Sequence, residues 1–266
     1  MTDPILAANP RLSSWLRVLP DDGVVEVRTG RVELGQGVIT AMAQVAAEEL
    51  DINPARIRVV PATTGLSPDE GYTAGSLSIQ HGAPALRAVC AQARGRYLAA
   101  AADHLGVDVA TLTVADGEIK APDGRTTSYW KLPALPDTDI TGAYPVKSPD
   151  EYRIVGTSVP RLDLPDKVTG RPRYVHDLAF PGQCYGQVVR PPSRGARLAG
   201  LDENPASSLA GVITIVRDGD FLAVIAERIE VALRAAALLR QSARWDSRPT
   251  LPDPGDLPGY LRSAPA

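Results

Sequence analysis

A proline-rich stretch in the middle of the chain, residues 131–152, does most to limit how this sequence can fold. Its four prolines, Pro133, Pro136, Pro145 and Pro149, interrupt any helical or strand period. Such a composition is typical of an extended linker, and 266 residues are enough for about two domains. We therefore predict one domain at 1–130, a linker at 131–152, a second domain at 153–246 and a proline-rich tail at 247–266.

The first half of the chain has the pattern of a strand, a helix and a second strand. Apolar and charged residues alternate over 24–28, which predicts a strand, and another short strand is predicted at 57–60. Between them a helix starts at Val38 and stops before Asn53-Pro54. Its face with Val38, Met42 and Val45 is expected to lack part of its partner surface.

The remaining elements follow the same kinds of signal. A long loop at 62–78 precedes an alanine-rich helix at about 85–104, whose composition favours close packing against a neighbour, and Ala115-Asp116-Gly117 predicts a hairpin over 111–120. Further on, strands are predicted at 173–178, 185–190, 212–216 and 221–226, with a helix at about 229–240. The predicted fold class is α+β.

Two glycines that bracket a glutamine at the entry to the first helix form the most informative motif. Gly35, Gln36 and Gly37 stand directly before Val38. Glycines let a ligand approach the backbone, the first N–H groups of a helix are unpaired, and a glutamine amide can donate and accept. The turn suits an anionic ligand, although such turns also commonly just connect a strand to a helix without binding a ligand.

A second candidate lies in the long loop. Thr73, Ala74, Gly75 and Ser76 could form a backbone nest for a phosphate, or could cap a helix beginning near Ile79. Other residues that are catalytic by type, Asp163, Asp166, Lys167 and Arg190, stand beside Pro and Gly and are expected on solvated turns.

Composition argues against several classes of function. The net charge is −3 with no Lys/Arg run, so no nucleic-acid partner is expected. No stretch of about 18 apolar residues and no signal peptide is visible, so we expect no membrane segment and a cytoplasmic location. The two cysteines, Cys90 and Cys184, and three scattered histidines predict no metal site or iron–sulfur cluster held by this chain.

Three stretches together resemble the molybdopterin-binding subunits of the xanthine dehydrogenase/aldehyde oxidase family, in the branch of isoquinoline 1-oxidoreductase and nicotinate dehydrogenase. They are GRVELGQGVITAMAQVAAEE at 30–49, GYTAGSLS at 71–78 and the stretch 155–192 with its PRLDLPDKVTG pattern. The resemblance implies a partial molybdenum-cofactor-binding α/β domain followed by a hammerhead α+β domain.

The resemblance also implies what the chain does. Gly35, Gln36, Gly37 and the turn Thr73, Ala74, Gly75 and Ser76 would contact molybdopterin cytosine dinucleotide carrying molybdenum. The reaction implied is hydroxylation of an aldehyde or N-heteroaromatic carbon with oxygen derived from water. The catalytic glutamate and the Gly-Gly-Phe-Gly-Gly loop of the family are absent here, so no catalytic residue is assigned and the isolated chain is predicted to be inactive.

The implied partners are a second chain or a missing C-terminal half that completes the molybdenum domain, and an iron–sulfur subunit. The sequence leaves open whether the chain is a natural split subunit or a fragment. It also leaves open a non-catalytic protein that keeps the hammerhead domain for interaction or assembly.

Overall fold

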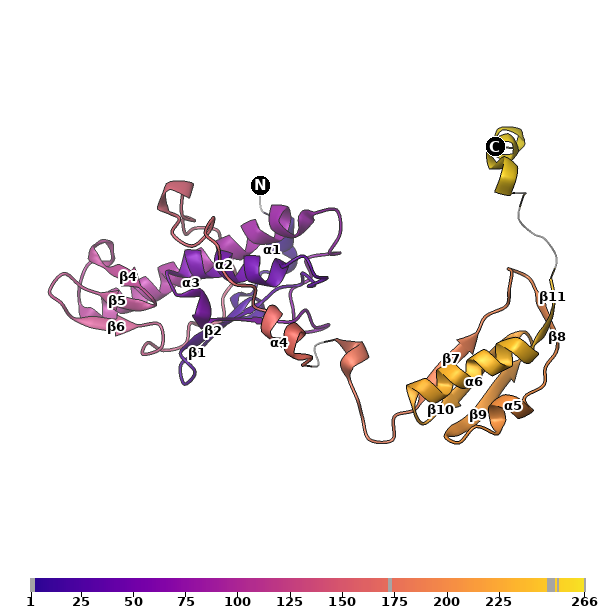
Figure 1. Cartoon of the computed structure of the whole chain (residues 1–266). Coiled ribbons are helices and arrows are strands. Elements are labelled where there is room, and N and C mark those ends of the chain that lie inside the picture. The colour runs from indigo at the N-terminus through magenta and orange to yellow at the C-terminus, as the bar shows by residue number, and fades with distance from the viewer. Residues whose placement is uncertain (1–2, 172–173, 248–251, 253, 266) are drawn as a thin grey trace. The chain divides into compact units, whose positions relative to one another are not determined.

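The computed structural model describes residues 3–171, 174–247, 252 and 254–265. The chain divides into two compact units, residues 1–172 and residues 173–266 (Figure 1). We refer to them as the first and the second unit.

The first unit is built on a three-stranded sheet of mixed direction. β1 (Leu16–Leu19) pairs antiparallel with β2 (Val24–Arg28), and β2 pairs parallel with β3 (Ile57–Val60). Parallel neighbours require a crossover connection, and α2 (Val38–Leu50) provides it. The predicted strand, helix and strand are therefore confirmed.

Helix α3 (Ala83–Leu105) packs on α2 and completes the core of this unit. The predicted close packing is confirmed, because Ala85, Ala93 and Ala101 are all 0% exposed. The expectation that the apolar face of α2 lacks a partner surface is wrong for Val38 and Met42, which are 4% and 0% exposed. α3 supplies the surface that the sequence pattern could not assign to it.

An antiparallel meander lies at one end of the first unit, formed by β4 (Thr113–Ala115), β5 (Glu118–Lys120) and β6 (Thr126–Ser128). The predicted hairpin between the first two is confirmed, and the third strand was not predicted. Asp116 and Gly117 both have positive φ, 49° and 73°. A two-residue hairpin turn with both φ values positive matches the twist of the flanking strands, which explains the Asp-Gly pair.

The proline-rich stretch 131–152 is not a free linker, and the chain does not divide there. It runs along the first unit, where the Gln92 side chain donates to the Asp139 carbonyl at 2.9 Å and accepts from the Thr141 N–H at 2.7 Å. Tyr144 lies directly over Gly95 of α3. The prolines prevent regular structure, but side chains of α3 satisfy the backbone polar groups of the stretch in place of a ladder.

Residues 153–171 also belong to the first unit, although the sequence assigned them to the second domain. The buried Glu48 carboxylate of α2 accepts hydrogen bonds from the N–H groups of Arg153, Ile154 and Val155 at 2.8, 2.6 and 3.0 Å. Farther along, the Leu162 N–H donates to Thr40 Oγ1 at 3.0 Å. These contacts hold the segment along α2 up to the short helix α4 (Leu164–Thr169). A second short helix, α1 (Pro4–Ala8), precedes β1.

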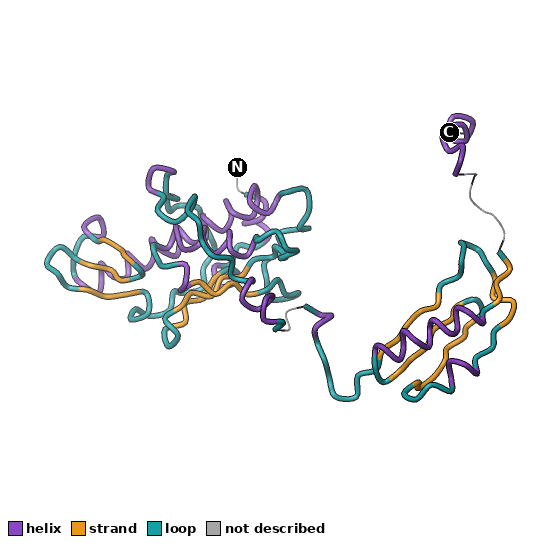
Figure 2. The backbone as a smooth tube through the Cα atoms, in the orientation of Figure 1, coloured by secondary structure: helices purple, strands orange, loops and turns teal. Residues whose placement is uncertain are grey.

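The second unit is an antiparallel sheet with a helix on one face (Figure 2). The strand order is β7 (Tyr185–Val189), β10 (Phe221–Ala226) and β9 (Val212–Asp218), and α6 (Ile229–Ser242) packs on β7 and β10. The core between them holds Val189, Leu222, Val224, Ala235 and Leu239. The α+β fold class is confirmed.

Other parts of the second unit differ from the prediction. β8 (Arg197–Gly200) pairs with β11 (Arg244–Asp246), a pairing that was not predicted, and α5 (Asn204–Ser207) lies between β8 and β9. No strand forms at 174–178, where residues 175–177 make one 3₁₀ turn, and Arg173 lies outside the described residues. In the predicted tail, 248–251 and 253 lie outside the described residues, and α7 (Leu257–Ser263) follows.

Candidate functional site

The Gly-Gln-Gly turn and the loop at 73–76 lie beside each other on the first unit. The Val32 N–H donates to Thr73 Oγ1 at 2.9 Å and links the two. Together they line a pocket of about 440 Å³, whose walls are Leu34, Gln36, Gly37, Val38, Ala41, Thr73, Ala74, Gly75, Ser76, Ser78 and Ile79. Six of the seven residues predicted from the sequence thus meet at one pocket, and Gly35 is the one outside its lining.

Backbone conformation explains the glycines of the turn. Gly35 and Gly37 have φ values of 105° and 84°, in a region that side chains with a Cβ rarely adopt. A Cβ built on Gly35 would meet nothing within 4 Å, so its conformation and not crowding requires glycine there. Gly37 is also the N-cap residue directly before α2.

Two N–H groups at the start of α2, those of Gly37 and Ile39, are paired, although the sequence predicted unpaired ones. The Glu33 carboxylate accepts from the N–H groups of Gly35, Gly37 and Ile39 at 2.8, 2.9 and 3.2 Å. Burial raises the pKa of Glu33, but these backbone donors outweigh burial and leave its pKa below the ordinary 4.5. A carboxylate of the chain therefore already occupies the anion position at this helix end.

Glu33 was missed as a site residue, although a signal for it was present. An acidic residue a few positions before a predicted helix is favoured by the helix dipole and by free N–H groups.

The Gln36 side chain is exposed and closes its own turn. Its Oε1 accepts from the Leu34 N–H at 2.5 Å and its Nε2 donates to the Val32 carbonyl at 3.0 Å. Both ends of the amide hold the loop in shape. The amide still has one N–H and one lone pair for a ligand.

The loop at 73–76 contains a turn with two successive positive φ values. Gly75 and Ser76 have φ values of 61° and 59°, and the Leu77 N–H donates to the Ala74 carbonyl at 3.2 Å. The alternative that this segment caps the following helix is wrong, because Leu77 stands at the cap of the π-helical turn Ser78–Gly82 and no side chain caps it.

A buried ion pair joins the bases of the two loops. Arg31 Nε lies 3.3 Å from Glu70 Oε2, and the two side chains are 2% and 1% exposed. Glu70 Oε1 also accepts from Thr29 Oγ1 at 2.6 Å and from the Gly30 N–H at 2.7 Å. Arg31 Nη1 donates to the Tyr72 carbonyl at 2.8 Å. The network fixes the spacing between the two loops from below.

A known family matches the stretch of the chain that contains this pocket. The sequence pattern of the molybdopterin cofactor-binding domain family matches residues 3–158, more than half of the chain. The chain belongs to this family.

Two relatives align with nearly all of the chain. One is a subunit of the nicotinate dehydrogenase of Pseudomonas putida, to which it is 38% identical over 256 residues, covering 92% of this chain and 21% of that protein. The other is the beta subunit of isoquinoline 1-oxidoreductase from Brevundimonas diminuta, with 29% identity over 290 residues, covering 93% of this chain and 36% of that protein. This chain therefore spans about a fifth and about a third of these two relatives.

Among solved structures, the Cu,Mo-CO dehydrogenase is similar over 38% of this chain and 16% of its own, with 22% identity and a TM-score of 0.30.

The pocket has donors that fit a molybdopterin cofactor. Within the described part of the chain, the N–H groups of Gln36, Ala74, Gly75 and Ser76 donate to no protein acceptor. The lining carries no charged side chain. Backbone N–H groups and an amide are donors of the kind that phosphate and pterin oxygens accept.

The cysteines and histidines among the described residues are not grouped around a possible metal ion. Among the described residues, no group of three or more His, Cys, Asp or Glu side chains is arranged to hold a metal ion. Cys90 is fully buried in the core, and burial raises the pKa of its thiol above the ordinary range. Cys184 is exposed in the second unit.

Asp163 lies in a buried ion pair and not on a solvated turn as expected. Its side chain is 1% exposed, and it accepts from the Arg161 guanidinium at 2.9 and 2.7 Å. Arg161, and then Lys167, hold the pKa of Asp163 well below its usual range. Asp163 therefore stays ionised at any pH near neutrality and does not suit the role of a proton-accepting base.

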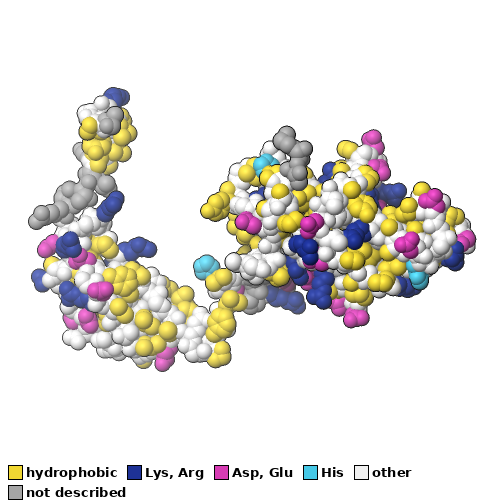
Figure 3. Space-filling view, turned by 180° about the vertical axis from the view of Figure 1, so that it is seen from behind, with side chains coloured by type: hydrophobic (Ala, Val, Ile, Leu, Met, Phe, Trp, Pro, Cys, Tyr) yellow, Lys and Arg dark blue, Asp and Glu magenta, His cyan; other side chains and the backbone are white. Residues whose placement is uncertain are grey.

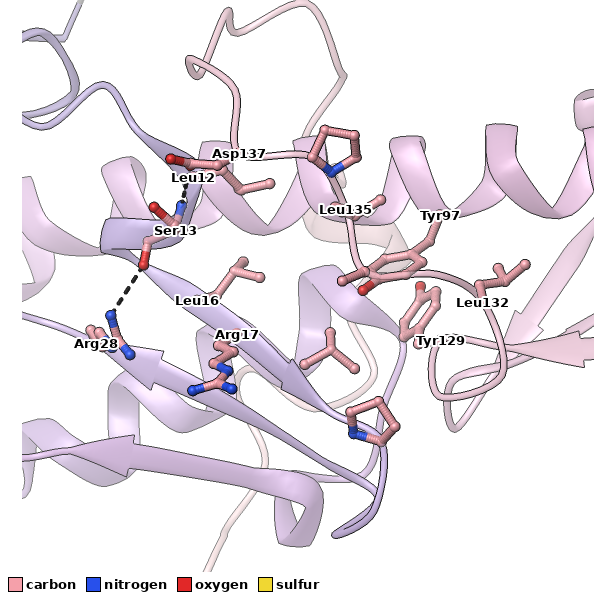
Figure 4. Close-up of a pocket in the computed structure, with 14 residues that line it drawn as sticks. Leu12, Ser13, Leu16, Arg17, Arg28, Tyr97, Tyr129, Leu132, Leu135 and Asp137 are labelled. Atoms are coloured by element: carbon pink, nitrogen blue, oxygen red, sulfur yellow. Dashed lines mark hydrogen bonds between the residues drawn. The ribbon is translucent and has the colours of Figure 1, made fainter.

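A second pocket, of about 410 Å³, lies between β1 and residues 132–137 (Figure 4). Tyr97 and Tyr129 face each other at its wall with ring centroids 4.8 Å apart. Burial raises the pKa of Tyr97 to about 12, so it remains a neutral phenol. None of the residues predicted from the sequence lines this pocket.

The surface of the first unit is mixed in character on the face drawn in Figure 3, where basic and acidic side chains lie among hydrophobic ones. Among the described residues, no helix has the length and apolar character to span a bilayer.

Proposed function

We propose that this chain is part of a molybdenum hydroxylase that hydroxylates an aldehyde or N-heteroaromatic substrate with oxygen taken from water. The observation that carries the proposal is the pocket shared by the Gly-Gln-Gly turn and the loop at 73–76, inside the stretch that matches the family. The two relatives are named for nicotinate and isoquinoline, which are both N-heteroaromatic compounds, and this supports the substrate class.

The residues of the pocket would hold the cofactor in its cytosine dinucleotide form. The N–H groups of residues 74–76 and of Gln36 would donate to its phosphate and pterin oxygens. A pocket of about 440 Å³ has the size that encloses a drug-sized ligand. A dinucleotide cofactor is larger, so another part of the enzyme would cover the rest of it. The chemistry supplied by the bound cofactor is two-electron oxidation of the substrate.

The two carboxylates nearest the pocket are poorly suited to act as the catalytic base, which supports a base outside this chain. Glu33 is held by three backbone N–H groups, and Glu70 is buried in its pair with Arg31. Each carboxylate already accepts three hydrogen bonds from the chain, which argues against a role in taking a proton from a bound water. On this proposal the chain contributes cofactor contacts without the catalytic glutamate, and the isolated chain is inactive.

Further parts of the proposal concern the rest of the enzyme. The second unit, a sheet of three strands covered by α6, would be the hammerhead domain. A second chain or C-terminal half would complete the molybdenum domain. An iron–sulfur partner would carry electrons away, since two cysteines cannot ligate a cluster. The expected location is the cytoplasm.

Substitution of Gln36 in the complete enzyme, with its partner chains present, tests the proposal. Gln36→Ala should lower the molybdenum and cytosine nucleotide content of the purified enzyme. Gln36→Glu should lower it further, because it places an anion beside an anionic cofactor. The matched control is Gln241→Ala, which removes an exposed glutamine from α6 in the second unit.

Parental molybdenum content in both Gln36 variants would contradict the site assignment. A parental enzyme that contains no molybdenum would instead favour the non-catalytic assembly protein.

A further inference from the structure

Arg161 connects the start of α4 with the Gly-Gln-Gly turn. Its Nη1 donates to the Gly35 carbonyl at 3.0 Å, and its Nη2 lies 3.7 Å from Glu33 Oε1. The guanidinium also lies over Gly37, because a Cβ built there would be 3.7 Å from its central carbon. One side chain thus contacts three successive parts of the turn.

The orientation of Arg161 is fixed from the opposite side by Asp163. The buried carboxylate receives two parallel hydrogen bonds from the guanidinium, through Nε and Nη2, and Lys167 Nζ donates to the same carboxylate. Such a two-point pair restricts the guanidinium to one plane. The remaining nitrogen, Nη1, is then directed at the Gly35 carbonyl.

We propose that Arg161 is a positioning residue that keeps the Gly-Gln-Gly turn in the shape that receives the cofactor. This inference rests on the proposed function. Gly35 lies outside the pocket lining, so Arg161 acts on the turn from behind, while Gln36 and Gly37 face the pocket. No sequence pattern indicated this role, because Arg161 is 126 residues away from Gly35.

Arg161→Lys separates the two contacts of the arginine, which are the ion pair with Asp163 and the hydrogen bond to the Gly35 carbonyl. Lysine can still pair with Asp163, but its single ammonium cannot form the two-point pair and also reach the Gly35 carbonyl. Arg161→Lys should therefore keep the buried ion pair and the melting temperature, and lose the hold on the turn. Arg161→Ala should lose both.

Hydrogen exchange of the turn in cofactor-free enzyme, made in cells that cannot synthesise molybdopterin, gives a readout that is independent of activity. The amides of Gly35, Gly37 and Ile39 are protected by Glu33 and report the shape of the turn. In Arg161→Lys and Arg161→Ala we expect them to exchange about fivefold faster. In the loaded enzyme, both variants should hold less molybdenum than the parental protein.

Arg171→Ala, which removes an arginine that is 76% exposed from the same segment, is the matched control and should change neither value. The inference requires both changes in Arg161→Lys, and parental exchange or parental molybdenum content in that variant overturns it. If Gln36→Ala lowers molybdenum content and Arg161→Lys does not, only this inference fails. If neither does, the proposed function fails as well.

Discussion

The two loops beside the pocket have a buried floor, which does not line the pocket, and an exposed rim, which does, and the floor and the rim differ in how their polar groups are used. The floor consists of Thr29, Arg31 and Glu70, which are buried and hydrogen-bonded to one another or to the loop backbone. The rim consists of Gln36 and residues 74–76, which are exposed and whose N–H groups have no protein acceptor in the described part of the chain. The floor and the rim belong to the same two loops.

Because of this difference, the floor contributes mainly to the stability of the fold, and the rim contributes mainly to ligand binding. Buried charges are costly unless they are paired, so the floor is sensitive to any loss of a partner. Exposed N–H groups cost little, because water satisfies them until a ligand does. We therefore expect floor substitutions to unfold the protein and rim substitutions to change only what it binds.

The largest effect is expected from Glu70→Ala in the floor. It leaves the Arg31 guanidinium buried without its carboxylate, which should lower the free energy of unfolding by about 3–5 kcal/mol. Urea unfolding of the chain measures this loss. Glu118→Ala, at an exposed position of β5, is the control and should stay within about 0.5 kcal/mol of the parental value. A loss below about 1 kcal/mol for Glu70→Ala would show that the floor does not carry the stability assigned to it.

A smaller effect is expected for Glu33→Ala, which removes the acceptor for three N–H groups at the start of α2. Loss of a helix-capping acceptor costs about 1–2 kcal/mol. Glu33→Gln keeps one amide oxygen as acceptor and should cost less. Equal unfolding free energies for the two variants would mean that the carboxylate oxygens do not hold the turn.

Acid should weaken the fold through Glu33 and Glu48, whose pKa values are both below 4.5 in the folded chain. The unfolded chain then binds protons before the folded chain as the pH falls. The stabilisation is complete above the unfolded pKa and is lost as the pH drops through the folded pKa. We expect the melting temperature to fall between about pH 5 and about pH 3, and less steeply in Glu33→Gln. Parallel melting curves for the two proteins across this range would contradict the lowered pKa of Glu33.

The smallest change in stability is expected for Gln36→Ala in the rim. Its two hydrogen bonds lie in an exposed loop, so the free energy of unfolding should stay within about 0.5 kcal/mol of the parental value. A much larger loss of unfolding free energy would show that Gln36 stabilises the fold as the floor residues do. A lower molybdenum content of Gln36→Ala would then reflect unfolding.

The sequence predicted those parts of the structure in which the pattern of one segment is sufficient. Strand β2, helices α2 and α3 and the Asp116-Gly117 hairpin follow from periodicity and turn chemistry. The boundary between the two units was not predicted correctly, because composition cannot show that the Gln92 side chain binds the backbone of the proline-rich stretch. β8 and β11 were missed because each is short and pairs with a distant partner.

The same limit applies to the candidate site. Glycines and a glutamine before a helix indicated the turn, residues 73–76 were a second candidate in the long loop, and the resemblance to a family then assigned both to the cofactor. The groups that shape these loops, Arg31, Glu70 and Arg161, act through contacts between segments far apart in the chain. Arg31 and Arg161 lie in stretches that resemble the family, but the sequence does not show which distant groups these side chains contact.

The most direct test of the proposed cofactor site is to fill the pocket and measure the cofactor. Ala74→Trp places a large side chain among the exposed residues of the rim. Ala134→Trp places one in the other pocket, which Figure 4 shows. In the complete enzyme, Ala74→Trp should lose most of its molybdenum and cytosine nucleotide while its melting temperature stays near the parental value, and Ala134→Trp should keep its cofactor. Parental cofactor content in Ala74→Trp, or an equal loss in both variants, would contradict the claim that these two loops form the cofactor site.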